Sequence, residues 1–102
     1  MSEERFQTMM MKPEDTVAVA LADIKKGTTL TVACQQERFQ ITLKHSIEFG
    51  HKFAVKPMEK GEDVLKYGEI IGVTNRSIEV GEHVHVHNVE GKRGRGDRIA
   101  GA

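Results

Sequence analysis

A short glycine-centred unit recurs four times in this sequence and constrains the fold more than any other feature. Each copy has an apolar residue three positions before a glycine and another three positions after it. Glycine permits a positive φ in a tight turn, and the flanking apolar side chains would point inward on either side. We therefore expect each unit to form a strand, a glycine turn and a returning strand. The glycines are Gly27, Gly50, Gly61 and Gly81.

The segments around these turns have the length and composition of β-strands. They are short and β-branched, and none shows an apolar stripe at helical spacing over three turns. A chain of 102 residues also leaves room for only one domain. The sequence thus predicts a mostly β, single-domain protein. The expected strands are residues 16–22, 29–34, 39–43, 52–55, 63–67, 69–73 and 83–89.

The two ends of the chain lack this pattern. Residues 1–12 show no periodicity and predict a flexible leader, whereas residues 91–102 alternate glycine with charge and predict a flexible basic tail. The folded domain is expected to span residues 13–90.

Charge and cysteine content exclude several classes of protein. Fifteen Lys and Arg residues balance fifteen Asp and Glu residues, so no net positive charge favours nucleic acid or an anionic membrane. The single Cys34 cannot form an internal disulfide, and its apolar strand predicts a buried, inert thiol. The start of the chain lacks the features of a signal peptide, and no apolar run approaches the roughly 20 residues of a membrane span. We expect a cytoplasmic protein.

Three histidines alternate with valines in the segment His83–His87. On a strand, His83, His85 and His87 would share one face, and Val84 and Val86 would face the core. Neighbouring histidines would be about 6.6 Å apart at Cα, whereas His83 and His87 would be about 13 Å apart. A metal ion would therefore take a pair of these imidazoles, together with a third group from elsewhere.

Other interpretations of these polar residues stay open. The histidine face could equally be the half-exposed side of an edge strand without a ligand. His51, beside Lys52 after a turn glycine, is a second candidate polar contact. Lys66 and Tyr67 place a cation beside a phenol and could bind a carboxylate or hydroxyl of an acidic sugar. Solvated surface side chains would give the same pattern.

Several blocks of the chain, in order, resemble the SAF domain of the altronate and galactarate dehydratase family. The resemblance covers roughly residues 13–90 and is most specific in the last two blocks, Lys-Tyr-Gly-Glu-Ile-Ile-Gly and Gly-Glu-His-Val-His-Val-His-Asn. The matching blocks are residues 15–21, 41–44, 50–54, 66–72 and 81–88.

The resemblance implies a β-clip fold and a role in a hydro-lyase that dehydrates a sugar acid such as altronate to a 2-keto-3-deoxy acid. It further implies Fe(II) or Mn(II) in the assembled enzyme and a separate large catalytic subunit, because the sequence stops after the SAF region. Since the small chain offers no complete catalytic site, we expect a non-catalytic or incomplete subunit. Its expected substrate contacts are His51, Lys52, Lys66, Tyr67, His85 and His87.

Two further hypotheses compete with this one. The chain could be a free-standing module that binds a small ligand or a metal through His83, His85 and His87. It could also form homo-oligomers through exposed β edges.

Overall fold

The computed structural model describes residues 8–91. These residues form short strands joined by turns and loops, which confirms the mostly β expectation. No helix among them has the length and apolar character needed to cross a membrane. The strands are β1 (Thr8–Met9), β2 (Val17–Ala20), β3 (Thr29–Cys34), β4 (Glu37–Thr42), β5 (Lys52–Ala54), β6 (Asp63–Lys66), β7 (Glu69–Thr74), β8 (His83–Val84) and β9 (Val89–Glu90).

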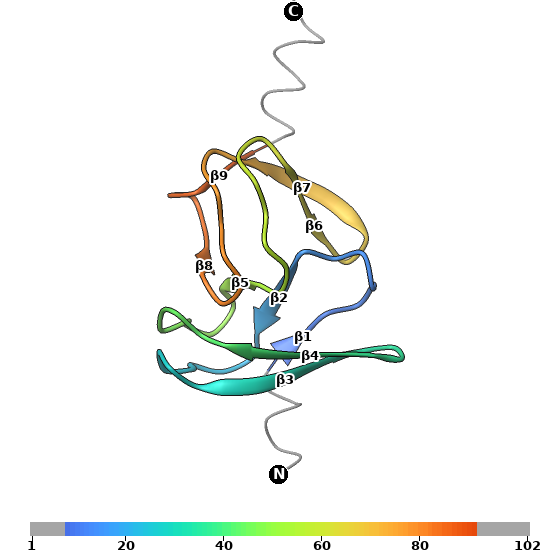
Figure 1. Ribbon diagram of the computed structural model, residues 1–102, viewed down its shortest axis with the longest axis vertical. Coiled ribbons are helices and arrows are strands. Elements are labelled where there is room, and N and C mark those ends of the chain that lie inside the picture. Colours follow the sequence, from blue (N-terminus) through green and yellow to red (C-terminus); the bar gives the residue numbers. More distant parts are fainter. Residues whose placement is uncertain (1–7, 92–102) are drawn as a thin grey trace, which may run out of the picture.

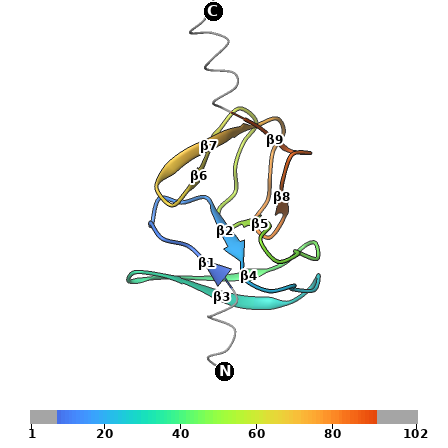
Figure 2. The same ribbon diagram turned by 180° about the vertical axis from the view of Figure 1, so that it is seen from behind.

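The strands pair in three antiparallel sheets. One sheet has the order β1-β2-β5-β8, the second is the β3–β4 hairpin, and the third has the order β6-β7-β9. Figures 1 and 2, seen from opposite sides, show β2 and β5 between the β3–β4 hairpin at one end and the β6–β7 hairpin at the other. Segments distant in the sequence therefore meet in the middle of the molecule.

Six of the seven expected strands are present, five of them with shifted ends, and the exception is the segment 83–89. The strand 29–34 is found as predicted in β3, whereas β2 is shorter than the predicted 16–22. The segment 83–89 is not one strand, because it is broken into β8, a turn and β9.

Part of the expected leader belongs to the fold. Thr8 of β1 pairs with Ala20 of β2, and the side chain of Met10 is buried. The fold therefore includes residues 8–12, which the sequence placed before the domain. Residues 1–7 of the leader and 92–102 of the tail lie outside the described residues.

The four predicted glycine turns are present. Gly27, Gly50, Gly61 and Gly81 have φ values of 87°, 85°, 86° and 90°. In each turn the N–H of the residue after glycine donates to the carbonyl three residues earlier, as in Glu82 to Glu79 at 3.1 Å. The conformation needs glycine because L side chains rarely adopt a positive φ.

The turns do not close hairpins within each unit, which corrects the expected strand, turn and returning strand. Instead, the apolar residue before each glycine bridges to its counterpart in another unit, Ile24 with Ile47 and Met58 with Ile78. Each glycine N–H also donates to a carbonyl of a different segment, for example Gly81 to Ala54 at 2.9 Å. The units therefore interlock as two pairs.

The apolar residues of the units form the core, as their spacing predicts. Buried side chains fall into two clusters, one around Leu30, Ile47 and Phe53 and one around Met58 and Val84. Cys34 lies in the first cluster and is buried; burial raises the pKa of its thiol, and nearby Asp15 and Glu37 raise it further.

Candidate metal and anion site

The histidine segment bends after its second residue. The side chain of Asn88 accepts a hydrogen bond from the His85 N–H at 2.9 Å and donates to the His83 carbonyl at 2.8 Å. Asn88 is fully buried, and its amide pairs two backbone groups that a continuing strand would otherwise have to pair. The prediction that residues 85–87 continue the strand with alternating faces is therefore wrong. Val84 faces the core as predicted, but Val86 is 78% exposed instead of buried.

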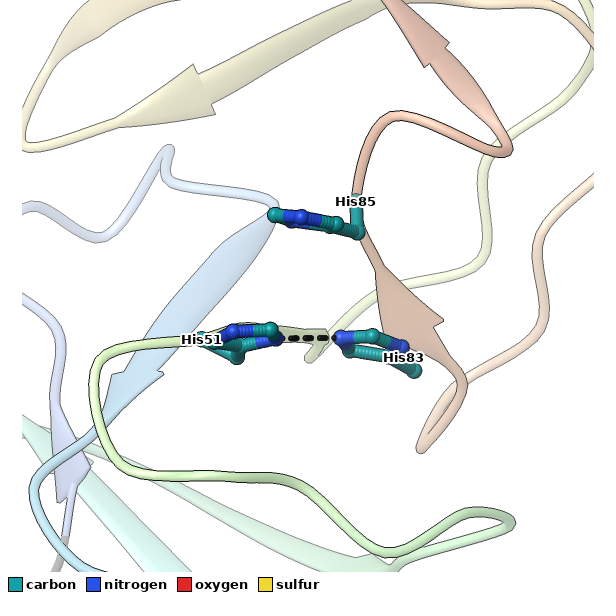
Figure 3. Close-up of side chains that lie close together, drawn as sticks. All are labelled: His51, His83 and His85. Atoms are coloured by element: carbon teal, nitrogen blue, oxygen red, sulfur yellow. Dashed lines mark hydrogen bonds between the residues drawn. The ribbon is translucent and has the colours of Figure 1, made fainter.

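The bend brings histidines together from two distant segments. The Nδ1 atom of His51 lies 2.8 Å from Nε2 of His83, and the ring of His85 stacks on His51 with centroids 4.6 Å apart. Figure 3 shows the three rings nearly parallel, with His51 opposite His83. One ring nitrogen of each residue lies within 4.8 Å of those of the other two. We call His51, His83 and His85 the histidine triad.

Strand pairing and turns hold the triad in place. His83 lies in β8, opposite Phe53 of β5, and His51 precedes β5 directly. The turn at Gly50 fixes His51, whose carbonyl accepts a hydrogen bond from the Ala20 N–H at 2.8 Å. The triad therefore depends on a β5–β8 contact that links residues about thirty positions apart.

The members of the triad differ from the predicted metal ligands. His83 and His85 form one of the two expected pairs, the other being His85 with His87, and His51, which the sequence assigned to substrate, is the third residue of the group. His87 is outside this group, although its ring lies 5.3 Å from that of His83. The predicted 13 Å separation of His83 and His87 does not apply, because the segment is bent.

Electrostatics around His83 favour a neutral ring. Partial burial lowers the pKa of His83, and the neighbouring rings, first His51, lower it further. A neutral imidazole has the free lone pair that a metal ion requires. The hydrogen bond between His51 and His83 needs one ring to donate, so an ion between them would replace that proton.

Two residues that the sequence did not single out support the site. The His83 N–H donates to Nδ1 of His45 at 3.1 Å. Asn88 sets the bend. Because asparagine is a typical turn residue, its position after His87 is the signal that could have predicted a turn instead of a straight strand.

A pocket of about 340 Å³ adjoins the triad at His85. Lys52 and Lys66, both expected substrate contacts, line it, whereas Tyr67 lies on the β6–β7 turn with the Lys66 ammonium 4.9 Å from its ring centroid. Burial lowers the pKa of Lys52, and the charge of Lys66 lowers it further. The apolar part of the pocket wall comes from Ile71, Val84, Val86 and Val89.

The fold and the triad define a small all-β domain with a cluster of imidazoles beside a cationic pocket. The family model for the altronate/galactarate dehydratase SAF domain matches residues 6–92. The chain belongs to this family, as the resemblance of its sequence blocks predicted.

Named relatives fall into two groups by length. Altronate dehydratase of Escherichia coli (strain K12) is 46% identical over 74 residues, which cover 72% of this chain and 14% of the relative. The (2R)-sulfolactate sulfo-lyase subunit alpha of Chromohalobacter salexigens is 41% identical over 83 residues, 78% of this chain and 88% of that subunit. The same subunit of Paracoccus pantotrophus is 44% identical over 62 residues, 61% of this chain and 92% of that subunit. The chain thus matches a small part of the dehydratase and most of each sulfo-lyase subunit.

Proposed function

We propose that this chain is the small subunit of a lyase that removes a group from a hydroxy acid, in partnership with a larger catalytic chain. The altronate dehydratase and sulfo-lyase relatives support the reaction class. Their lengths favour a separate subunit, because the chain spans most of a protein named subunit alpha. We also propose a cytoplasmic location. The single Cys34 cannot form an internal disulfide, and proteins of the reducing cytosol rarely contain disulfides.

The observation that carries this proposal is the convergence of His51, His83 and His85. Their ring nitrogens lie within 4.8 Å of one another, so a small shift would let all three reach one ion. Imidazole suits Fe(II) well, whereas Mn(II) prefers oxygen ligands that substrate or the larger chain would add. Bound there, the ion would supply Lewis-acid polarisation of the substrate's oxygens.

The other residues of the site would bind and orient the substrate. Lys52 and Lys66 would hold an acidic group of the hydroxy acid in the pocket, and His51 would act as a ligand rather than as a direct substrate contact. Tyr67 would position the Lys66 ammonium through the face of its ring. The exposed side of His85 leaves room for ligands from the larger chain.

Anaerobic calorimetry with Fe(II), Mn(II) and Zn(II) tests the metal part of the proposal. We expect the isolated chain to bind one ion and His85→Ala to lose this binding. His87→Ala is the matched control, because it removes an imidazole from the same turn but outside the triad. Binding that persists in His85→Ala would contradict the triad.

Reconstitution tests the subunit part. We expect the isolated chain to show no dehydratase or sulfo-lyase activity, and activity to need a larger chain encoded beside it. Activity of the isolated chain towards altronate or galactarate would contradict the accessory role.

A free-standing metal-binding module is the second candidate, and the origin of all three imidazoles in this one chain favours it. The module predicts tight metal binding that does not change when the larger chain is added. The subunit predicts that addition of the larger chain tightens metal binding.

A further inference from the structure

The second glycine turn places a carboxylate beside the triad. The Oε1 atom of Glu48 lies 3.8 Å from Nε2 of His51. The turn itself brings the two side chains together, because the His51 N–H donates to the Glu48 carbonyl at 2.9 Å around Gly50, whose φ is 85°. The contact between carboxylate and imidazole is therefore built into the second unit.

The other units use the two equivalent positions differently. In the third and fourth units the residue after the glycine is a glutamate, and the carboxylates of Glu62 and Glu82 accept hydrogen bonds from the backbone N–H three residues earlier, at 2.9 and 2.7 Å. The first unit has Lys25 and Thr28 at these positions. In the second unit the residue after the glycine is an imidazole that faces His83 instead (Figure 3). The pair of acid and imidazole is thus not a general requirement of the turn.

The two nitrogens of the His51 ring face different groups. Its Nδ1 lies 2.8 Å from Nε2 of His83, whereas its Nε2 is the nitrogen near Glu48. An ionised carboxylate only accepts hydrogen bonds, and a neutral imidazole carries a single N–H. Glu48 therefore favours the proton on Nε2 of His51, which leaves the lone pair of Nδ1 directed toward His83. The opposite tautomer would place a lone pair against the carboxylate.

We propose that Glu48 is a positioning residue that holds His51 in the tautomer needed to bind a metal ion through Nδ1. A carboxylate that accepts from the other nitrogen of a metal-bound imidazole orients the ring and makes it a stronger ligand. This inference rests on the proposed function, because it assigns the ion to the triad. The Glu48 side chain is 80% exposed, so it can rotate the short distance to a hydrogen bond, and its effect is smaller than that of a buried carboxylate.

Glu48→Gln tests the inference, because it removes the charge and keeps the size of the side chain. Glu59→Gln is the matched control, since Glu59 is exposed and holds the same position in the third unit. Long-range proton–nitrogen NMR spectra of the metal-free chain at about pH 8, where an imidazole of ordinary pKa is neutral, identify the protonated nitrogen. We expect His51 to carry its proton mainly on Nε2 in the unsubstituted chain and in Glu59→Gln, and to lose this preference in Glu48→Gln.

Zn(II) calorimetry on the same three samples measures the consequence for the metal site. Affinity should fall about three- to tenfold in Glu48→Gln and stay unchanged in Glu59→Gln. An Nδ1–H tautomer of His51, a tautomer preference that survives in Glu48→Gln, or an equal loss of affinity in Glu59→Gln would overturn the inference and leave the metal site intact. An unsubstituted chain that binds no Zn(II) would overturn the proposed metal site and this inference with it.

Discussion

Replacing Gly81 by alanine tests whether the interlocked glycine turns determine the geometry of the site. A Cβ atom at Gly81 would lie 2.3 Å from the carbonyl oxygen of Thr42 and 3.3 Å from the backbone nitrogen of Lys44. Both contacts are with backbone atoms, which cannot rotate away. Gly27 is the matched control, because its φ of 87° is nearly the same as the 90° of Gly81, yet a Cβ there meets nothing within 4 Å.

Both substitutions place alanine at a positive φ, but only Gly81→Ala also creates a steric clash. An alanine held at positive φ loses about 1–2 kcal/mol in either variant. In Gly81→Ala the clash adds about 1–3 kcal/mol, because the Thr42 strand end must move. That shift also strains the hydrogen bond from the Lys44 N–H to the Gly81 carbonyl, 2.9 Å long. We expect destabilisation of about 2–5 kcal/mol for Gly81→Ala and about 1–2 kcal/mol for Gly27→Ala.

Urea unfolding followed by far-ultraviolet circular dichroism, in the presence of a chelator, measures both free energies. Metal affinity, measured on the folded variants, should fall in Gly81→Ala and stay unchanged in Gly27→Ala, since Gly81 lies two residues before His83. Equal destabilisation of the two variants would refute the steric argument. Unchanged metal affinity in Gly81→Ala would refute the link between turn and site.

Three further predictions concern single buried side chains. Asp15→Ala should destabilise the fold by about 3 kcal/mol in urea unfolding, because the buried carboxylate accepts hydrogen bonds from the N–H groups of Met11, Lys12 and Gly68; a loss below 1 kcal/mol would contradict this role. Asn88→Ala should weaken Zn(II) binding about 10- to 100-fold in calorimetry although Asn88 lies outside the triad, and unchanged affinity would contradict its positioning role. Because the pKa of Cys34 is raised in the folded chain, the unfolded thiol ionises first, so the free energy of unfolding should fall as pH rises above about 8.5. Cys34→Ala should lose this part of the pH dependence; an identical slope in both proteins would show that Cys34 does not contribute.

The features that the sequence predicted well are those that depend on neighbouring residues. A glycine that needs a positive φ, with apolar residues three positions away on each side, defines a turn and its buried flanks without reference to the rest of the chain. The burial of Ile24, Leu30 and Val84 follows directly from this spacing. The hairpin β3–β4 is local in the same sense, and the expected strand 29–34 is present.

The errors arise where a side chain or a distant segment decides the conformation. Alternation of His and Val predicts a straight strand, but the two hydrogen bonds of Asn88 stabilise a turn that residue alternation does not encode. His51 joins the triad only because β5 pairs with β8, and no local pattern specifies that pairing. The sequence therefore predicted a metal-binding pair that could include His83 and His85, but assigned their neighbour His51 to substrate.

The repeated turns place the triad where the two pairs of units meet. The bridge between Ile24 and Ile47 joins the first two units, and the bridge between Met58 and Ile78 joins the last two. His51 belongs to the first pair and His83 to the second, so the hydrogen bond between their rings crosses from one pair to the other. Any change that separates the two pairs would therefore move His51 away from His83, which is why we expect the turn at Gly81 to influence metal affinity as well as stability.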